Sequence, residues 1–163
     1  MPTEHLKITT SEGHELSGAL ELPTGLVRGA AVFAHCFTCT KQSKGAKVVT
    51  QSLAREGIAS LRFDFTGLGG SQGEFGRAGF ASDVEDLIAS AEHLIARFDC
   101  RILLVGHSLG GAAVLAAATE LGRDNVAAVA TIGAPSDVPH VLHNIKGELD
   151  EIESEGEGEV TIG

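Results

Sequence analysis

Tryptophan and tyrosine are absent from this 163-residue sequence, so an apolar core has to be built from aliphatic residues, alanine and seven phenylalanines. A membrane-spanning helix needs about 18 consecutive apolar residues, and no apolar run in the sequence is that long. The first residues, MPTEHLKITT, lack the basic segment and apolar run of a secretory signal. We therefore expect a soluble, cytoplasmic protein with no membrane partner.

A basic patch is also missing, and a nucleic-acid partner is therefore not expected. The chain has 22 acidic and 12 basic residues, for a formal net charge of -10. Seven of the acids lie between Glu148 and Glu159, where no basic residue occurs, and the remainder of the chain has a net charge of only -3. Such a run is usually a solvated face, and an acidic binding tail is the alternative.

Cysteine is scarce, with three residues in a chain that has no export features. An odd number of cysteines in such a chain favours reduced thiols. Cys36 and Cys39 form a C-x-x-C motif, which predicts either a redox pair or half of a zinc site. The second half is missing, because Cys100 stands alone. We therefore expect no metal and no cofactor, and we interpret Cys36 and Cys39 as a small apolar residue and a loop residue near the pocket.

The hydrophobic pattern alternates between short apolar runs and segments with helical spacing, which is typical of βαβ units. It predicts an α/β fold, in which a mostly parallel sheet has helices on both faces and an antiparallel pair at its edge. The expected strands are His5–Thr10, His14–Leu22, Gly29–His35, Ile58–Phe63, Arg101–Val105 and Val126–Ile132; the expected helices are Lys44–Gly57, Ser82–Phe98 with a Ser82/Glu85 capping box, Gly110–Leu121 and Ser136–Ile145.

The segment Gly106-His107-Ser108-Leu109-Gly110 fits the pattern G-x-S-x-G, with an apolar strand before it and a helix of small residues after it. A serine on a tight strand-to-helix turn has a strained backbone, and flanking side chains would collide there. The start of the helix adds partial positive charge where an oxyanion would develop. Ser108 is the candidate nucleophile, supported by Gly106, His107 and Gly110. The alternative is a serine that only caps a helix.

The loop after the strand Gly29–His35 is the second candidate feature. Acyl-transfer enzymes of this architecture place a backbone oxyanion donor there. We expect the N–H groups of Phe37 and Leu109 to form the oxyanion hole and His35 to be a buried structural residue. The glycine-rich stretch Thr66–Gly73 does not have dinucleotide-binding spacing. Asp64 precedes this stretch and is expected to anchor the loop by internal hydrogen bonds.

Four segments together resemble the α/β-hydrolase family of serine esterases, lipases and aminopeptidases: VFAHCFT, LRFDFTGLGGSQG, VGHSLGG and ATIGAP. AHCFTCTK, RFDFTGLGGS and DVPHVLHNIKGELDEIE resemble, more narrowly, bacterial hydrolase domains that precede an OsmC-like domain. The resemblance implies a serine hydrolase acting on an ester, thioester or amide of a small acyl substrate, with an OsmC-like partner domain at the C-terminal side.

The acid and the histidine that complete such a site have no clear counterpart. This fold places them after later strands, and only one strand is expected after Ser108. Asp137 lies three residues from His140, so the two cannot approach a serine from opposite ends of an imidazole, and His143 is expected on the same helix. We therefore expect residues 1–135 to be the N-terminal part of a hydrolase core and 136–163 the start of an incomplete cap segment. A non-catalytic truncated fold or interaction module is the alternative.

Overall fold

The computed structural model describes residues 1–36, 39–136, 146–147 and 160–161. The expected helix Ser136–Ile145, apart from its first residue, and the acidic run between Glu148 and Glu159 lie outside these residues. None of the helices in the described ranges is long and apolar enough to span a membrane.

The predicted strands and the three predicted helices that fall in the described ranges are confirmed, each within two residues at either end. A short 3-10 helix, which was not predicted, precedes the second of these helices. In chain order the elements are β1 (Thr3–Thr9), β2 (Glu15–Glu21), β3 (Gly29–Ala34), α1 (Lys44–Arg55), β4 (Ile58–Phe63), η1 (Phe75–Arg77), α2 (Phe80–Phe98), β5 (Ile102–His107), α3 (Leu109–Leu121), β6 (Val126–Ile132), β7 (Lys146–Gly147) and β8 (Val160–Thr161).

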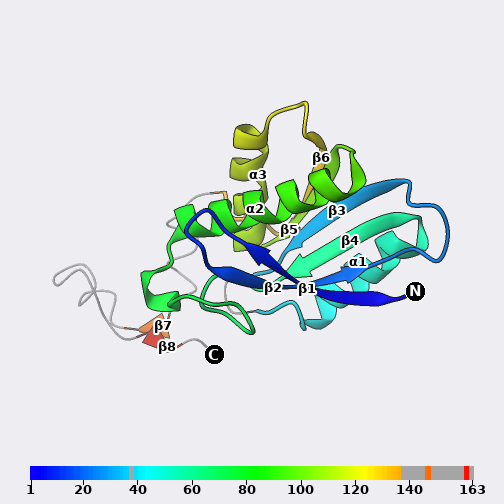
Figure 1. Ribbon diagram of the computed structural model, residues 1–163. Helices are drawn as coiled ribbons and strands as arrows, with labels where there is room; N and C mark the ends of the chain where they lie inside the picture. Colours follow the sequence, from blue (N-terminus) through cyan, green and yellow to red (C-terminus); the bar gives the residue numbers. More distant parts are fainter. Residues whose placement is uncertain (37–38, 137–145, 148–159, 162–163) are drawn as a thin grey trace.

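The main sheet has six strands in the order β1-β2-β4-β3-β5-β6 (Figure 1). β1 pairs with β2, and β2 with β4, in antiparallel fashion, whereas β4, β3, β5 and β6 are parallel. The chain thus enters the sheet through an antiparallel edge, as expected, and the α/β fold class is confirmed. Because β3 lies between β4 and β5, the loops that follow these three strands meet at one edge of the sheet.

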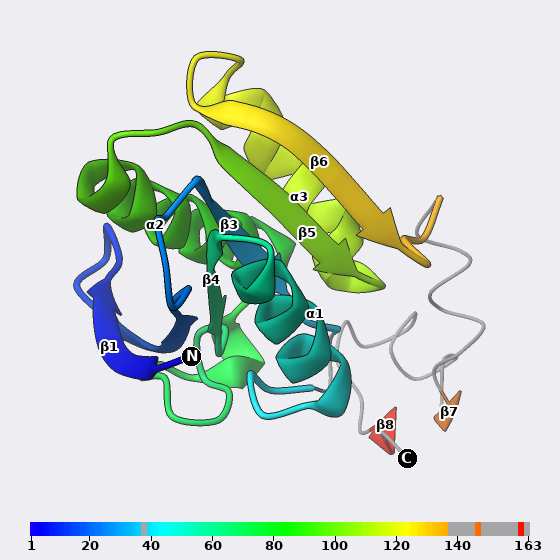
Figure 2. The same ribbon diagram turned by 90° about the vertical axis from the view of Figure 1, so that its right-hand side faces the viewer.

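Helices cover both faces of the sheet. α1 lies on one face, and α2 and α3 lie together on the other (Figure 2). Alternate residues of each central strand serve the two layers. On β3, for example, Val32 packs in the core under α2 and α3, whereas Phe33 packs against Ala46 of α1.

The helix ends show which local signals were decisive. Ser43 caps α1, because its side chain accepts a hydrogen bond from Ala46 N at 3.4 Å. The predicted capping box of α2 is wrong: the helix begins at Phe80, and Gly79 is the N-cap without a side-chain bond. The Gly79 carbonyl accepts from Asp83 N at 3.1 Å, so the first turn forms before Ser82 can act as a cap.

Beside the antiparallel edge, a buried ion pair joins β2 to β4. Arg62 donates to Glu21 at 2.6 Å, to the Thr50 hydroxyl of α1 at 3.1 Å and, through Nε, to the Lys41 carbonyl at 2.9 Å. Thr3 Oγ1 donates to the second oxygen of Glu21 at 2.8 Å. Both charged groups are buried, so their hydrogen-bond partners have to offset the free energy that each group loses when it is removed from water.

We expect Arg62→Met to destabilise the fold strongly, since it leaves the Glu21 carboxylate buried without its cation. Loss of one partner of a buried pair costs about 3–5 kcal/mol. The matched control is Arg97→Met, which removes a two-pronged ion pair with Glu4 at the surface, worth about 0.2–1 kcal/mol. Urea unfolding of both variants measures the difference, and equal losses would contradict the importance of the buried pair.

Candidate active site

Ser108 occupies the turn between β5 and α3 and has φ 54° and ψ -122°. Among the described residues other than glycine, only Asp99 shares a positive φ. Such a conformation costs on the order of 1–3 kcal/mol and persists only where the surroundings hold it. Here Ser108 N donates to the Ile132 carbonyl at 2.9 Å, and the Ser108 carbonyl accepts from Gly111 N at 2.8 Å. The hydroxyl makes no hydrogen bond to a described residue.

The glycines of the motif are required by close backbone approach. A Cβ on Gly106 would overlap the Gly110 carbonyl, and a Cβ on Gly110 would overlap the carbonyls of Ala34 and His35. Each of these separations is below 3.0 Å, which real Cβ atoms essentially never show. The turn that carries Ser108 is thus packed directly against the end of β3.

The two expected oxyanion donors have different positions in the structure. Leu109 is the first residue of α3, and its N–H has no acceptor within the described part of the chain. The first N–H groups of a helix have no partner within the helix and lie at the positive end of its dipole, so the Leu109 N–H is suited to donate to an anion. Phe37 lies outside the described residues. His107 is exposed beside Ser108, and Gly110 is buried.

His35 is almost fully buried at the end of β3 and contacts Phe65 edge-to-face. Its Nδ1 lies 2.7 Å from the Cys36 carbonyl, an acceptor, so Nδ1 carries the hydrogen and donates. Burial lowers the pKa of His35 and keeps the ring neutral. The His35 ring therefore stabilises the loop through its bond to the Cys36 carbonyl, in agreement with the structural role expected for it.

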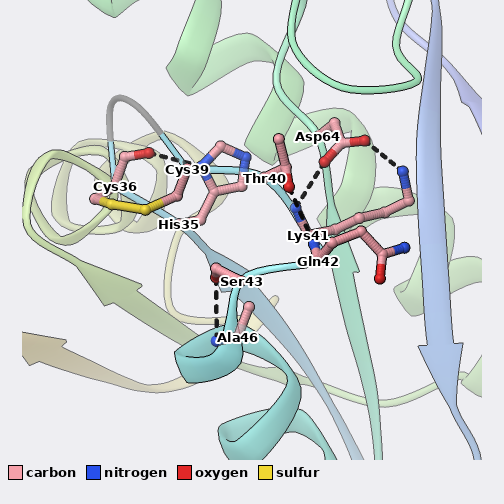
Figure 3. The surroundings of a disulfide bond; sticks show 9 residues. All are labelled: His35, Cys36, Cys39, Thr40, Lys41, Gln42, Ser43, Ala46 and Asp64. Atoms are coloured by element: carbon pink, nitrogen blue, oxygen red, sulfur yellow. Dashed lines mark hydrogen bonds and ion pairs between the residues drawn. A yellow bond between two sulfur atoms is a disulfide. The ribbon is translucent and has the colours of Figure 1, made fainter. Parts of the chain in front are cut away.

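Asp64, directly after β4, binds both neighbouring loops, and its bonds to Lys41 are drawn in Figure 3. Its carboxylate accepts from Lys41 N at 2.6 Å and from Gly70 N at 2.9 Å, and it pairs with the Lys41 ammonium. The Ser71 hydroxyl donates to the Asp64 carbonyl at 2.5 Å. The prediction of an anchoring aspartate is confirmed.

Cys36 and Cys39 form a disulfide with Cα atoms 5.3 Å apart. The expectation of reduced cysteines is therefore wrong for this pair. A turn in which Cys39 N donates to the Cys36 carbonyl at 3.1 Å brings the two residues within bonding range. Cys100 is a free thiol that packs against the main core.

A narrow hollow lies behind Leu109, between His35, Phe65 and Asp83. Its volume of about 10 Å³ is enough for roughly one water molecule. Burial, with the nearby Asp86 carboxylate, raises the pKa of Asp83 to about 6. Burial also raises the pKa of Asp86, although this carboxylate accepts two hydrogen bonds from Thr66, at 2.7 and 2.9 Å.

Sequence reasoning missed this pair of carboxylates. The only signal was their spacing of three residues on one helix, which puts both on the same face.

A known family model matches most of the chain. Residues 27–151, which include the Asp64 loop and the Ser108 turn, match the serine aminopeptidase S33 family of hydrolases. The chain belongs to this family. No curated protein sequence gave a significant match.

Solved structures of α/β hydrolases are similar to this S33 chain. An α/β serine hydrolase without lid from Xanthomonas campestris is 25% identical, with a TM-score of 0.73 over 83% of this chain and 64% of that chain. The esterase domain of a Rhodothermus marinus protein is 44% identical, with a TM-score of 0.70 over 92% of this chain and 57% of that chain.

A third similarity shows the fold alone. Est1E from Butyrivibrio proteoclasticus, solved with ferulic acid bound, is 24% identical, with a TM-score of 0.76 over 85% of this chain and 56% of that chain. This S33 chain therefore spans between about half and two thirds of the length of these three proteins.

We expect Gly110→Ala to destabilise the protein by about 1–3 kcal/mol or more, because the new methyl group meets backbone carbonyls that cannot rotate away. The matched control is Gly45→Ala at the exposed start of α1, where a Cβ has nothing within 4 Å. There we expect no loss, or a gain of up to about 1 kcal/mol from higher helix propensity. Thermal unfolding compares the two, and a Gly110→Ala variant as stable as the control would contradict the packing argument.

The raised pKa of Asp83 predicts a stability that depends on pH. A carboxyl with a pKa of about 6 in the folded state and an ordinary value of 3.8 binds more protons when folded. The free energy of unfolding therefore falls as pH rises from about 4 to about 7. Because Asp83 is only half-buried, we expect an effect on the order of 1–2 kcal/mol. Asp83→Asn should flatten this decline in urea titrations, and an unchanged slope would count against the shift.

Proposed function

We propose that this chain carries the nucleophile half of a serine hydrolase that cleaves esters, thioesters or amides of small acyl substrates. The observation that carries the proposal is the strained backbone of Ser108 at the start of α3, held by the close contact of Gly110 with β3. Membership of a hydrolase family and the similarity to an esterase domain support it.

In the proposed reaction, the Ser108 hydroxyl attacks the acyl carbon while a histidine takes its proton. The carbonyl oxygen becomes negatively charged and accepts hydrogen bonds from Leu109 N–H and, by the same proposal, from Phe37 N–H. The leaving group departs with a proton from the histidine, and water then releases the acyl group from Ser108. The positive end of α3 favours the charge that develops in both steps.

The acid and the histidine of this mechanism are not placed beside Ser108 by the described residues. Asp137, His140 and His143 lie outside those residues. We propose that the missing groups belong to the part of the hydrolase domain that related structures have in addition to the length of this chain. The OsmC-like domain and the cytoplasmic location expected from the sequence are part of the same proposal.

A non-catalytic role is the second candidate. It is favoured by one observation, that the Ser108 hydroxyl has no hydrogen-bonded base in the described ranges. A serine without a base is a poor nucleophile. On this hypothesis the chain is a truncated hydrolase fold that serves as an interaction module.

A fluorophosphonate probe distinguishes the two candidates. We expect the product of the full coding sequence to be labelled on Ser108, and Ser108→Ala to lower hydrolysis of a p-nitrophenyl ester by about 10⁴-fold or more. Ser11→Ala, at an exposed turn, is the matched control and should keep full activity. Equal hydrolysis by the Ser108→Ala variant would exclude Ser108 as the nucleophile, and absence of labelling would favour the non-catalytic role.

A further inference from the structure

The disulfide lies beside the backbone atoms that support the Ser108 turn. Cys36 directly follows His35, whose carbonyl, with that of Ala34, faces Gly110 so closely that no Cβ fits between them. A change in the path of the chain at Cys36 therefore acts on the surface against which the start of α3 is packed. Phe37 lies between the two cysteines in the sequence.

Noncovalent bonds hold the chain on both sides of the disulfide (Figure 3). On one side, the His35 ring donates to the Cys36 carbonyl at 2.7 Å. On the other side, Lys41 N donates to Asp64 at 2.6 Å, and the Lys41 carbonyl accepts from Arg62 at 2.9 Å. The ends of the segment are thus held by bonds other than the S–S bond, so we expect the fold to persist when the disulfide is reduced.

The length of the closed loop leads to the same conclusion. The sequence separation of the two cysteines is 3, and disulfides that close short loops restrict the unfolded chain least. Both cysteines are only half-buried, so a small thiol can reach them. A structural staple would be expected to join distant segments and to be inaccessible.

We propose that Cys36 and Cys39 are a reversible thiol–disulfide site whose redox state changes the packing behind Ser108 and, on the basis of the proposed hydrolase function, the reactivity of this serine. The reductant is a low-molecular-weight thiol of the glutathione class. Its thiolate attacks one sulfur, the S–S bond breaks, and a mixed disulfide forms. A second thiolate displaces the cysteine, which releases the small disulfide; two electrons pass to the protein, and its two thiolates take up two protons.

The first test measures the thiols and the fold together. The purified chain is equilibrated in glutathione buffers of graded potential and alkylated with N-ethylmaleimide, and its intact mass is determined. We expect a reversible change of two alkylated thiols, absent in Cys36→Ser and Cys39→Ser and retained in the control Cys100→Ser. Circular dichroism should show an unchanged fold. Unfolding on reduction would identify a structural staple, and a pair that does not reoxidise would also overturn the proposal.

The second test measures transmission to the Ser108 turn without relying on catalysis. Hydrogen exchange of a peptide covering residues 106–113 is compared between the oxidised and reduced chain. We expect exchange about threefold or more faster after reduction, because opening of this turn becomes easier. Unchanged exchange in that peptide would overturn the proposed coupling.

Fluorophosphonate labelling of the full-length product then separates the two proposals. We expect reduction to slow labelling of Ser108 by about tenfold or more, as expected when an oxyanion donor is displaced. If Ser108 is not labelled in either redox state, the hydrolase function fails, whereas the redox coupling is still decided by hydrogen exchange. Equal labelling rates in the two states would refute control of reactivity.

Discussion

The carboxylate of Asp64 is the interaction on which the arrangement of the site depends. A buried carboxylate is costly unless it is paired and hydrogen-bonded, and Asp64 is almost completely buried. Its donors come from two loops, Lys41 after β3 and Gly70 after β4. Because the charge has to be satisfied, both loops must converge on the end of β4. Gly69 has φ 53°, and a Cβ there would overlap the Asp64 carboxylate, so the glycine-rich loop can close around the charge only with glycine at this position.

A continuous set of contacts leads from this charge to Ser108. Asp64 fixes Lys41, and the segment that precedes Lys41 runs back through the disulfide to His35. The carbonyl of His35 in turn lies against Gly110, in the first turn of α3. The bonds of the Asp64 carboxylate and the close packing against Gly110 therefore involve the two ends of the same short stretch of chain, from His35 to Lys41. The stretch after β3 therefore contacts the buried charge through Lys41 and the start of α3 through His35.

The strands, three helices and the G-x-S-x-G turn could be predicted because their signals are local. Each apolar run, each stretch of helical spacing and the small residues around Ser108 can be recognised within a short window of the sequence. The Asp83–Asp86 pair could not be predicted, since charged residues on a helix are usually solvated, and the two hydrogen bonds that Asp86 accepts come from Thr66, in a loop that precedes the helix. The capping box at Ser82 failed for a related reason, because Gly79 forms the first turn earlier. The disulfide depends on a turn that the C-x-x-C motif alone does not specify.

The contacts that position Ser108 are distinct from the base that would activate its hydroxyl. Among the described residues, the turn is held by Ile132 of β6, whose carbonyl accepts from Ser108 N, and by the packing of Gly110 on the end of β3. The strain, on the order of 1–3 kcal/mol, is therefore stored whether or not a histidine is present. A protein that served only as a scaffold would be more stable with glycine in place of Ser108, since glycine adopts a positive φ without this cost. A strained serine between two glycines that cannot be substituted without overlap is what the proposed nucleophile requires, whereas a serine that only caps a helix needs no such strain.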